Sequence, residues 1–234
     1  MSIADNVKLV EERIASAADW AGRRSEEITL MAVSKTHPPE LVREAYEAGV
    51  RLFGENRVQE FAGKAGLVRD LVDAEWHLIG HLQTNKAAKA AELFSAVDSV
   101  HSLRLAEKLN AAAGSLGKKL SILIEVNVGG EEAKSGVAPD GEAQAGILEA
   151  APRLDHVAIR GLMTVPPYTE DPQQARPYFR RLRELRDRIA AQKLPAVEMS
   201  VLSMGMSHDF EVAIEEGSTC VRVGTAIFGE RNKP

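Results

Sequence analysis

The sequence has little of what disulfide frameworks, secretion or membrane insertion require. Cys220 is the one cysteine among 234 residues, which excludes an intrachain disulfide and suits a reducing cytosol. No apolar run approaches the roughly 18 residues of a membrane-spanning helix. The N-terminal stretch MSIADNVKLVEERI has charges scattered through it and lacks the apolar core of a signal peptide. These absences predict a cytoplasmic protein with no membrane partner, and the apolar surroundings of Cys220 predict a buried structural thiol.

The sequence also lacks an excess of positive charge. Lys plus Arg is 29 and Asp plus Glu is 34, a net charge of −5, so there is no electrostatic reason to expect a nucleic-acid partner. The arginine-rich stretch at 180–188 is not an exception. Leu182, Leu185 and Ile189 form an apolar stripe at helical spacing, which predicts an amphipathic helix with a solvated basic face.

Short apolar runs alternate with helical segments along the whole chain, with no linker or low-complexity tract between them, so residues 1–234 are predicted to form one domain. Strands are expected at 28–35, 51–54, 76–79, 96–100, 120–127, 157–164, 199–203 and 220–223. Helices are expected at 6–21, 40–48, 56–71, 85–93, 103–113, 142–151, 174–191 and 208–216. Eight such units predict a (β/α)₈ barrel with an extra N-terminal helix. The alternative, an open doubly wound sheet, would carry a glycine-rich loop after its first strand, where SKTHPP stands.

Active sites of such barrels lie at the carboxyl ends of the strands, and there Lys35 stands out. It follows the apolar run Leu30 to Val33, so its stem leaves a buried strand. Partial burial would lower the pKa of the amine and yield a neutral nucleophile able to attack an aldehyde. A solvent-exposed lysine at the rim is the alternative interpretation.

The last strand ends in a second candidate feature, Gly224-Thr225. A helical turn is expected to start there, and free N–H groups at a helix start bind phosphate. Ser203-Met204-Gly205 is the neighbouring loop, and a plain barrel-closing turn is the alternative. Together with Lys35, the turn predicts a phosphorylated aldehyde as ligand. Two classes fit: a sugar phosphate, as in Schiff-base aldolases, and pyridoxal phosphate.

Six segments, spread in order over nearly the whole chain, resemble the pyridoxal-phosphate homeostasis protein family, whose barrel is similar to the N-terminal barrel of alanine racemase. They are AVSKTHP at 32–38, LFGENRVQE at 52–60, WHLIGHLQTNK at 76–86, GLMTVPP at 161–167, LSMGMSHDFEVAI at 202–214 and GSTCVRVGTAIFGER at 217–231. The positions that match the family's cofactor contacts are Lys35, Asn56, His81, Ser203, Met204, Arg222, Gly224 and Thr225.

The resemblance gives most of these positions a role toward pyridoxal 5′-phosphate (PLP), and it implies no metal site. Lys35 matches the lysine that forms the internal Schiff base. Gly224 and Thr225 match the groups that hold the phosphate, and Ser203 with Met204 matches the loop beside it.

The remaining positions surround the ring. Asn56 matches an asparagine near the ring, and His81 matches a position at the pocket mouth. Arg222 matches the arginine that meets the pyridine nitrogen, and because a guanidinium accepts no hydrogen bond, it favours the unprotonated nitrogen and weakens electron-sink catalysis. Related racemases take a second catalytic base from a separate domain, and the sequence, which stops at Pro234, leads us to expect no such domain here.

The resemblance therefore implies a carrier and regulator of PLP that delivers it to apo-enzymes, with no catalytic residues and little or no turnover. The alternative is a PLP-dependent amino-acid racemase or lyase. The oligomeric state stays open, and a monomer is the default expectation. Two further lysines are candidates. Lys134 is either a transient second acceptor of the cofactor during its release or a solvated loop lysine. Lys86 is expected near the rim, where capping of a helix start by Thr84 or Asn85 is sufficient to explain the segment.

Overall fold

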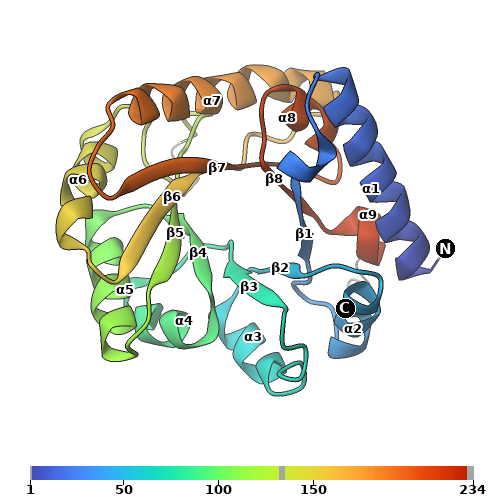
Figure 1. The fold of residues 1–234 in the computed structure, drawn as a ribbon, viewed down its shortest axis with the longest axis horizontal. Coiled ribbons are helices and arrows are strands. Elements are labelled where there is room, and N and C mark those ends of the chain that lie inside the picture. Colours follow the sequence, from blue (N-terminus) through green and yellow to red (C-terminus); the bar gives the residue numbers. More distant parts are fainter. Residues whose placement is uncertain (1, 132–134, 231–234) are drawn as a thin grey trace.

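Eight parallel strands close into a barrel in chain order, with β8 paired to β1, in the computed structural model, which describes residues 2–131 and 135–230 (Figure 1). The strands are β1 (Thr29–Val33), β2 (Leu52–Glu55), β3 (Glu75–Leu78), β4 (Ala96–Val100), β5 (Leu120–Glu125), β6 (Val157–Met163), β7 (Val197–Met206) and β8 (Cys220–Val223). The prediction of a (β/α)₈ barrel is confirmed, and the open sheet is excluded.

The helices form a ring outside the strands, and α1 is the extra N-terminal helix that the sequence predicts (Figure 1). The α-helices are α1 (Ile3–Trp20), α2 (Pro39–Glu47), α3 (Val58–Ala65), α4 (Ala87–Leu93), α5 (Leu103–Ser115), α6 (Glu142–Ala150), α7 (Arg176–Ala191), α8 (Phe210–Glu215) and α9 (Thr225–Phe228). Short 3₁₀ segments are η1 (Ser25–Glu27), η2 (Thr84–Lys86), η3 (Ala151–Arg153) and η4 (Pro172–Ala175). None of the helices in the described ranges combines the length and the hydropathy needed to cross a bilayer.

Helix α1 begins at a capping box and is anchored on the elements that close the barrel. The Ser2 hydroxyl accepts the N–H of Asp5, whose carboxylate accepts the N–H of Ser2 in return. Asn6 donates its side-chain amide to the carbonyl of Ile227 in α9 at 2.8 Å. This contact ties the N-terminal helix to the turn that follows β8.

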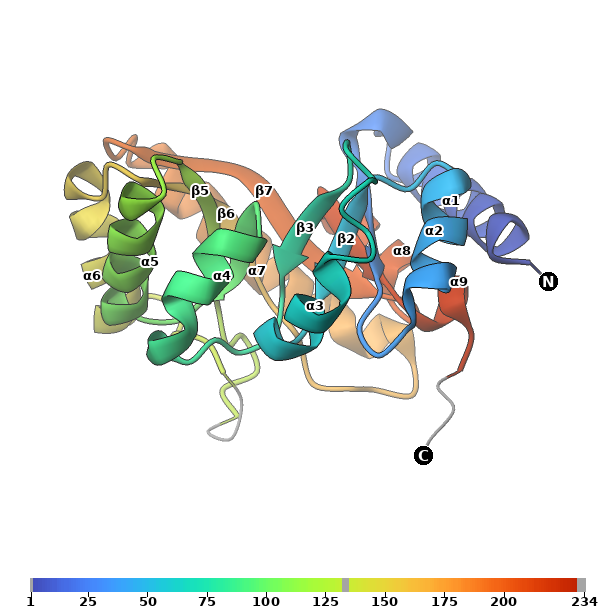
Figure 2. The ribbon, with the colours of Figure 1, turned by 90° about the horizontal axis from the view of Figure 1, so that it is seen from below.

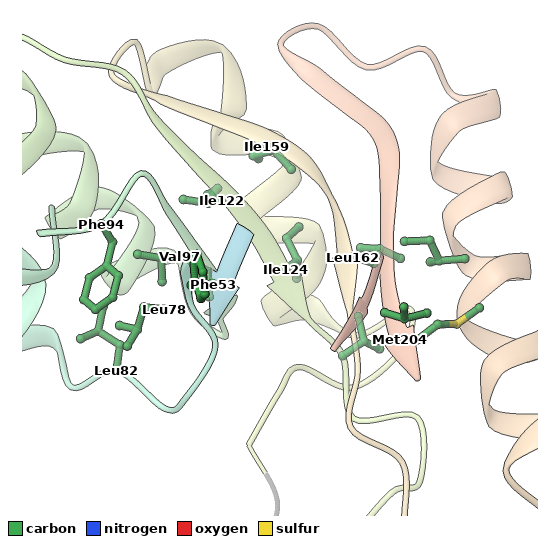
Figure 3. Packing of buried hydrophobic residues seen from close by; sticks show 14 of the residues in the cluster. Phe53, Leu78, Leu82, Phe94, Val97, Ile122, Ile124, Ile159, Leu162 and Met204 are labelled. Atoms are coloured by element: carbon green, nitrogen blue, oxygen red, sulfur yellow. The ribbon is translucent and has the colours of Figure 1, made fainter. Parts of the chain in front are cut away.

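Buried aliphatic and aromatic side chains fill the space between the strands and the surrounding helices. Phe53 and Leu78 project from β2 and β3 toward Phe94, while Leu162 and Met204 come from β6 and β7 (Figure 3). All five are essentially inaccessible to solvent. Burial of one side chain of this size contributes roughly 1.5–3 kcal/mol, so this layer is the main stabilising feature of the barrel.

Three expectations about element boundaries are wrong. The helix expected at 56–71 ends at Ala65, just before Gly66, one of two glycines that lower the helix propensity of this stretch. The strand expected at 199–203 continues to Met206, so Ser203 and Met204 lie in β7 rather than in a loop. Neither Thr84 nor Asn85 caps a helix, because the chain enters α4 through the 3₁₀ turn η2 instead.

Helix α7 confirms the amphipathic interpretation of the arginine-rich stretch, because its apolar stripe is buried and its arginines lie on the surface. Arg176 and Arg180 both donate to the carboxylate of Glu216, at 3.1 and 2.9 Å. The basic face is therefore partly neutralised by the barrel itself.

Alternate residues of each strand face the barrel interior. At the amino ends of the strands, Thr29, Leu52 and Cys220 line a cavity of about 1030 Å³. Cys220 is 5% exposed, and burial raises the pKa of its thiol to about 12, as expected for a structural thiol. Figure 2 shows the opposite end, where the loops after β1 and β6 project together.

Candidate functional site

Lys35 lies on the turn that leaves the carboxyl end of β1. Ser34 extends the strand pairing by donating its N–H to the carbonyl of Gly54 at 3.0 Å, and Lys35 itself is half-buried. Because Thr29 faces the interior, the alternation along β1 brings Lys35 to the interior side of the mouth. The predicted strand-end position of this amine is therefore present in the fold.

The turn that carries Lys35 is held in an unusual backbone conformation. Thr36 has φ +65°, in the left-handed region that β-branched residues rarely adopt. Its hydroxyl donates to the carbonyl of Lys35 at 2.6 Å, and its N–H donates to the carboxylate of Glu60 in α3. The His37 ring stacks on Phe228 of α9 with centroids 4.7 Å apart. These contacts join the lysine turn to α3 on one side and to α9 on the other.

A buried polar network, which we call the Ser34–Glu55–Lys64 network, lies beneath this turn. The Lys64 ammonium is 2.5 Å from a carboxylate oxygen of Glu55, and the Ser34 hydroxyl donates to the same oxygen at 2.7 Å. Burial raises the pKa of the Glu55 carboxyl, and the Lys64 charge opposes that rise. Sequence reasoning missed both residues, although a glutamate at the end of a buried strand was a visible signal.

The turn after β8 presents two backbone N–H groups to one point. Gly224 and Ala226 both donate to the hydroxyl of Ser207, at 3.1 and 3.3 Å, and Thr225 is the exposed first residue of α9. Converging N–H groups of this kind bind phosphate oxygens. Ser207 was not predicted as a site residue; it follows Met206, where β7 ends.

Arg222 is buried inside the barrel next to these groups. It is 3% exposed, and it donates to the Ser203 hydroxyl and to the Thr164 carbonyl, both at 2.7 Å. Ser203 therefore orients the guanidinium from β7. Met204 points the other way, into the hydrophobic layer (Figure 3).

Glu125, at the end of β5, is a second acidic residue that the sequence analysis did not select. It is 8% exposed, and one of its carboxylate oxygens has no hydrogen-bond partner among the described residues. Burial raises the pKa of its carboxyl to about 7, against the opposing charge of Arg222. A carboxyl that exchanges its proton near neutrality thus shares the barrel interior with Arg222.

The two predicted residues that follow β2 and β3, Asn56 and His81, lie at the rim. Asn56 is half-buried, and Gly80 packs closely against its backbone. His81 is exposed; its ring stacks on His101 with centroids 4.6 Å apart, and its Nδ1 is 3.1 Å from the Ser135 hydroxyl. Burial, and then the neighbouring His101, lower the pKa of His81.

Of the other lysines considered, Lys86 is half-buried in η2, and Lys134 lies outside the described residues. Within the described part of the chain no group of three His, Cys, Asp or Glu side chains is arranged to hold a metal ion. The groups at the carboxyl ends of the strands thus include the Lys35 amine, the Arg222 guanidinium, the converging N–H groups of Gly224 and Ala226, and the buried carboxyls of Glu55 and Glu125.

Replacing Gly80 with alanine is expected to destabilise the fold by about 2 kcal/mol, because the added Cβ would lie 2.2 Å from the Asn56 carbonyl oxygen. The free energy of unfolding would be measured by urea denaturation. Gly63→Ala is the matched control, since nothing lies within 4 Å of its added Cβ. Equal stabilities of the two variants would contradict the packing argument.

Comparison with known proteins identifies the family and the fold of the chain. The family model of the alanine racemase N-terminal domain matches residues 7–232. A pyridoxal phosphate homeostasis protein from Aquifex aeolicus (strain VF5) is 49% identical over 234 residues, which is 99% of each chain. The solved structure of PipY from Synechococcus elongatus PCC7942 with PLP bound is 39% identical, covers 94% of this chain and 100% of that one, and superposes with a TM-score of 0.79.

A solved alanine racemase from Clostridium difficile 630 shares the fold alone, at 16% identity and a TM-score of 0.74, over 98% of this chain and 58% of that chain. The close relatives, by contrast, match in sequence as well as in fold and along almost their full length. The chain therefore belongs to the pyridoxal phosphate homeostasis protein family, built on the barrel of the alanine racemase N-terminal domain.

Proposed function

We propose that this chain binds PLP, holds it as a Schiff base on Lys35, and acts as a monomeric carrier that releases it to apo-enzymes with little or no turnover of its own. The names of the close relatives and the PLP bound in the PipY structure support the ligand. The residues at the carboxyl end of the barrel support the mode of binding.

One observation carries the proposal: the amine and the converging N–H groups follow neighbouring strands. β1 pairs with β8, with Ala32 opposite Val223, so Lys35 and Gly224 leave the barrel side by side. PLP carries an aldehyde and a phosphate on one small ring, and these two strand ends offer a partner for each group. Sugar phosphates would satisfy the same two groups, but they have no ring nitrogen for Arg222 to meet.

The covalent step needs only water as a co-product. The neutral amine of Lys35 adds to the aldehyde carbon, a water molecule leaves, and a carbon–nitrogen double bond forms. Addition of water, or of an incoming amine, to the same carbon reverses the attachment and frees the Lys35 amine. This exchange would require water or the incoming amine to reach the carbon that Lys35 holds.

Arg222 is the residue that argues for a carrier rather than a catalyst. Bound PLP stabilises carbanions most strongly when a carboxylate keeps its pyridine nitrogen protonated. A buried guanidinium donates but cannot accept, so at the ring nitrogen it would favour the unprotonated form. Ser203 and the Thr164 carbonyl hold the Arg222 side chain in one orientation from two neighbouring strands.

The proposal is tested by adding PLP to the purified chain, reducing the product with borohydride and mapping the modified peptides. We expect an imine absorbance band and modification at Lys35, and not at Lys86 or Lys134. The loaded protein should then activate a PLP-dependent apo-enzyme, and free amino acids in deuterated water should not exchange their Cα hydrogen. Rapid exchange would favour the racemase or lyase, and absence of any imine would refute the Schiff base.

A further inference from the structure

Side-chain contacts of the Ser34–Glu55–Lys64 network join its own members and the turn that carries Lys35. Lys64 is 6% exposed and approaches three oxygens: the carboxylate of Glu55 at 2.5 Å, the carbonyl of Ser34 at 3.0 Å and the carbonyl of His37 at 3.3 Å. An ammonium has three donors, so these contacts use all of them. The two carbonyls belong to the residues at either end of the Lys35 turn.

Glu55 completes the network from the neighbouring strand. Its carboxylate accepts from Lys64 and from the Ser34 hydroxyl, which connects β2, α3 and the end of β1 at a single oxygen atom. Glu60, one helical turn before Lys64 in α3, accepts the Thr36 N–H. Three side chains from β2 and α3 therefore fix the backbone on both sides of Lys35.

Stability alone is a poor explanation for this arrangement. Removing two charges from water costs about as much as their attraction returns, and an apolar pair of similar volume often stabilises a fold equally well. Buried ion pairs are better explained where they select one conformation among several. Here the selected conformation includes Thr36 at φ +65°, which requires contacts from its surroundings to persist.

We infer that Glu55 and Lys64 are positioning residues, which hold the turn at 34–37 so that the Lys35 amine is presented to the aldehyde of the ligand. This inference rests on the proposed function, because it assigns the two residues a role in imine formation at Lys35. Lys64 itself does not compete as a nucleophile, since its three donors are engaged by oxygens. The network thereby also accounts for the choice of one lysine over another in the same region.

The test separates cofactor binding from imine formation. Lys64→Met is compared with the wild-type chain for total PLP retained after ultrafiltration and for the rate at which borohydride-trappable imine appears. Retention should change by less than about threefold, because the N–H groups of Gly224 and Ala226 are untouched. The rate should fall about tenfold or more, as expected when a nucleophile is misplaced. Lys64→Arg should recover part of the rate.

Lys118→Met is the matched control. Lys118 is half-buried, whereas Lys64 is buried. Lys118 also donates to a backbone carbonyl, that of Phe94 at 2.9 Å, but it precedes β5 at the other end of the barrel. Its replacement should leave the imine rate unchanged. If Lys64→Met does not fold, Glu55→Gln/Lys64→Met removes both charges together, and a folded double variant with the wild-type rate overturns the inference.

A second readout does not depend on PLP. Amide hydrogen exchange of the peptide that contains residues 34–38 should accelerate at least fivefold in Lys64→Met and remain unchanged in Lys118→Met. If the wild-type chain forms no imine, the proposed function fails, while the exchange measurement still decides whether the network holds the turn. Unchanged exchange in a folded Lys64→Met variant contradicts the positioning role directly.

Discussion

Lys35→Ala is expected to reduce borohydride-trapped PLP to background, because the amine that adds to the aldehyde is lost. The strand beneath it should tolerate the change, since Met31 to Ser34 stay buried and paired with β2 and β8. Some PLP should still bind without a covalent bond, through the N–H groups of Gly224 and Ala226. Absorbance spectra and intact mass after reduction measure the two forms separately.

Lys86→Ala is the matched control for this prediction. Lys86 is also half-buried and stands near the rim, in η2, so its removal tests whether any rim amine can accept the aldehyde. We expect this variant to form imine as the wild-type chain does. Trapped adduct that persists in Lys35→Ala, or disappears in Lys86→Ala, would move the attachment point away from β1.

Glu125→Gln is expected to remove a pH dependence of stability worth about 3 kcal/mol. The pKa of the Glu125 carboxyl is about 7 in the fold, against an ordinary value of 4.5. The folded chain therefore binds this proton more tightly than the unfolded chain does. The stabilisation is complete below pH 4.5 and is lost as the pH rises through 7.

The measurement is the free energy of unfolding of the cofactor-free chain, from urea titrations at several pH values between 4 and 8. The difference between Glu125→Gln and the wild-type chain should grow in favour of the variant across this window. Other groups with shifted pKa values, such as Glu55 and Asp209, are present in both proteins and cancel in the difference. A difference that stays constant with pH would show that Glu125 is solvated or paired.

The sequence predicted the barrel well because its signals are local. Short apolar runs such as 120–127 mark strands, Pro39 opens α2 at its first turn, and Gly49, at φ +105°, ends it. Eight parallel strands joined by helices can then form only a few sheet topologies, of which the closed barrel is one. One boundary that was wrong depends on a tertiary contact: β7 continues to Met206, which pairs with Arg222 of β8.

The residues of the candidate site also fall into two groups: those that the sequence identified and those whose burial depends on residues far away in the chain. Lys35, Gly224 and Arg222 were found because barrel topology selects strand ends and because the family pattern names them. Glu55 and Glu125 also stand at strand ends, yet a carboxylate there is equally compatible with a solvated rim. Whether it is buried depends on partners such as Lys64, whose distance from Glu55 no sequence pattern contains.

The hydroxyl of Ser207 lowers the free energy that a phosphate can gain by binding at the turn after β8. Because Gly224 and Ala226 already donate to it, an arriving phosphate trades one set of hydrogen bonds for another instead of satisfying two bare amides. The net free energy gained on binding phosphate is smaller than it would be for two unpaired N–H groups. Dissociation of the phosphate costs correspondingly less. Weak net binding of the phosphate would suit the proposed role as a PLP carrier.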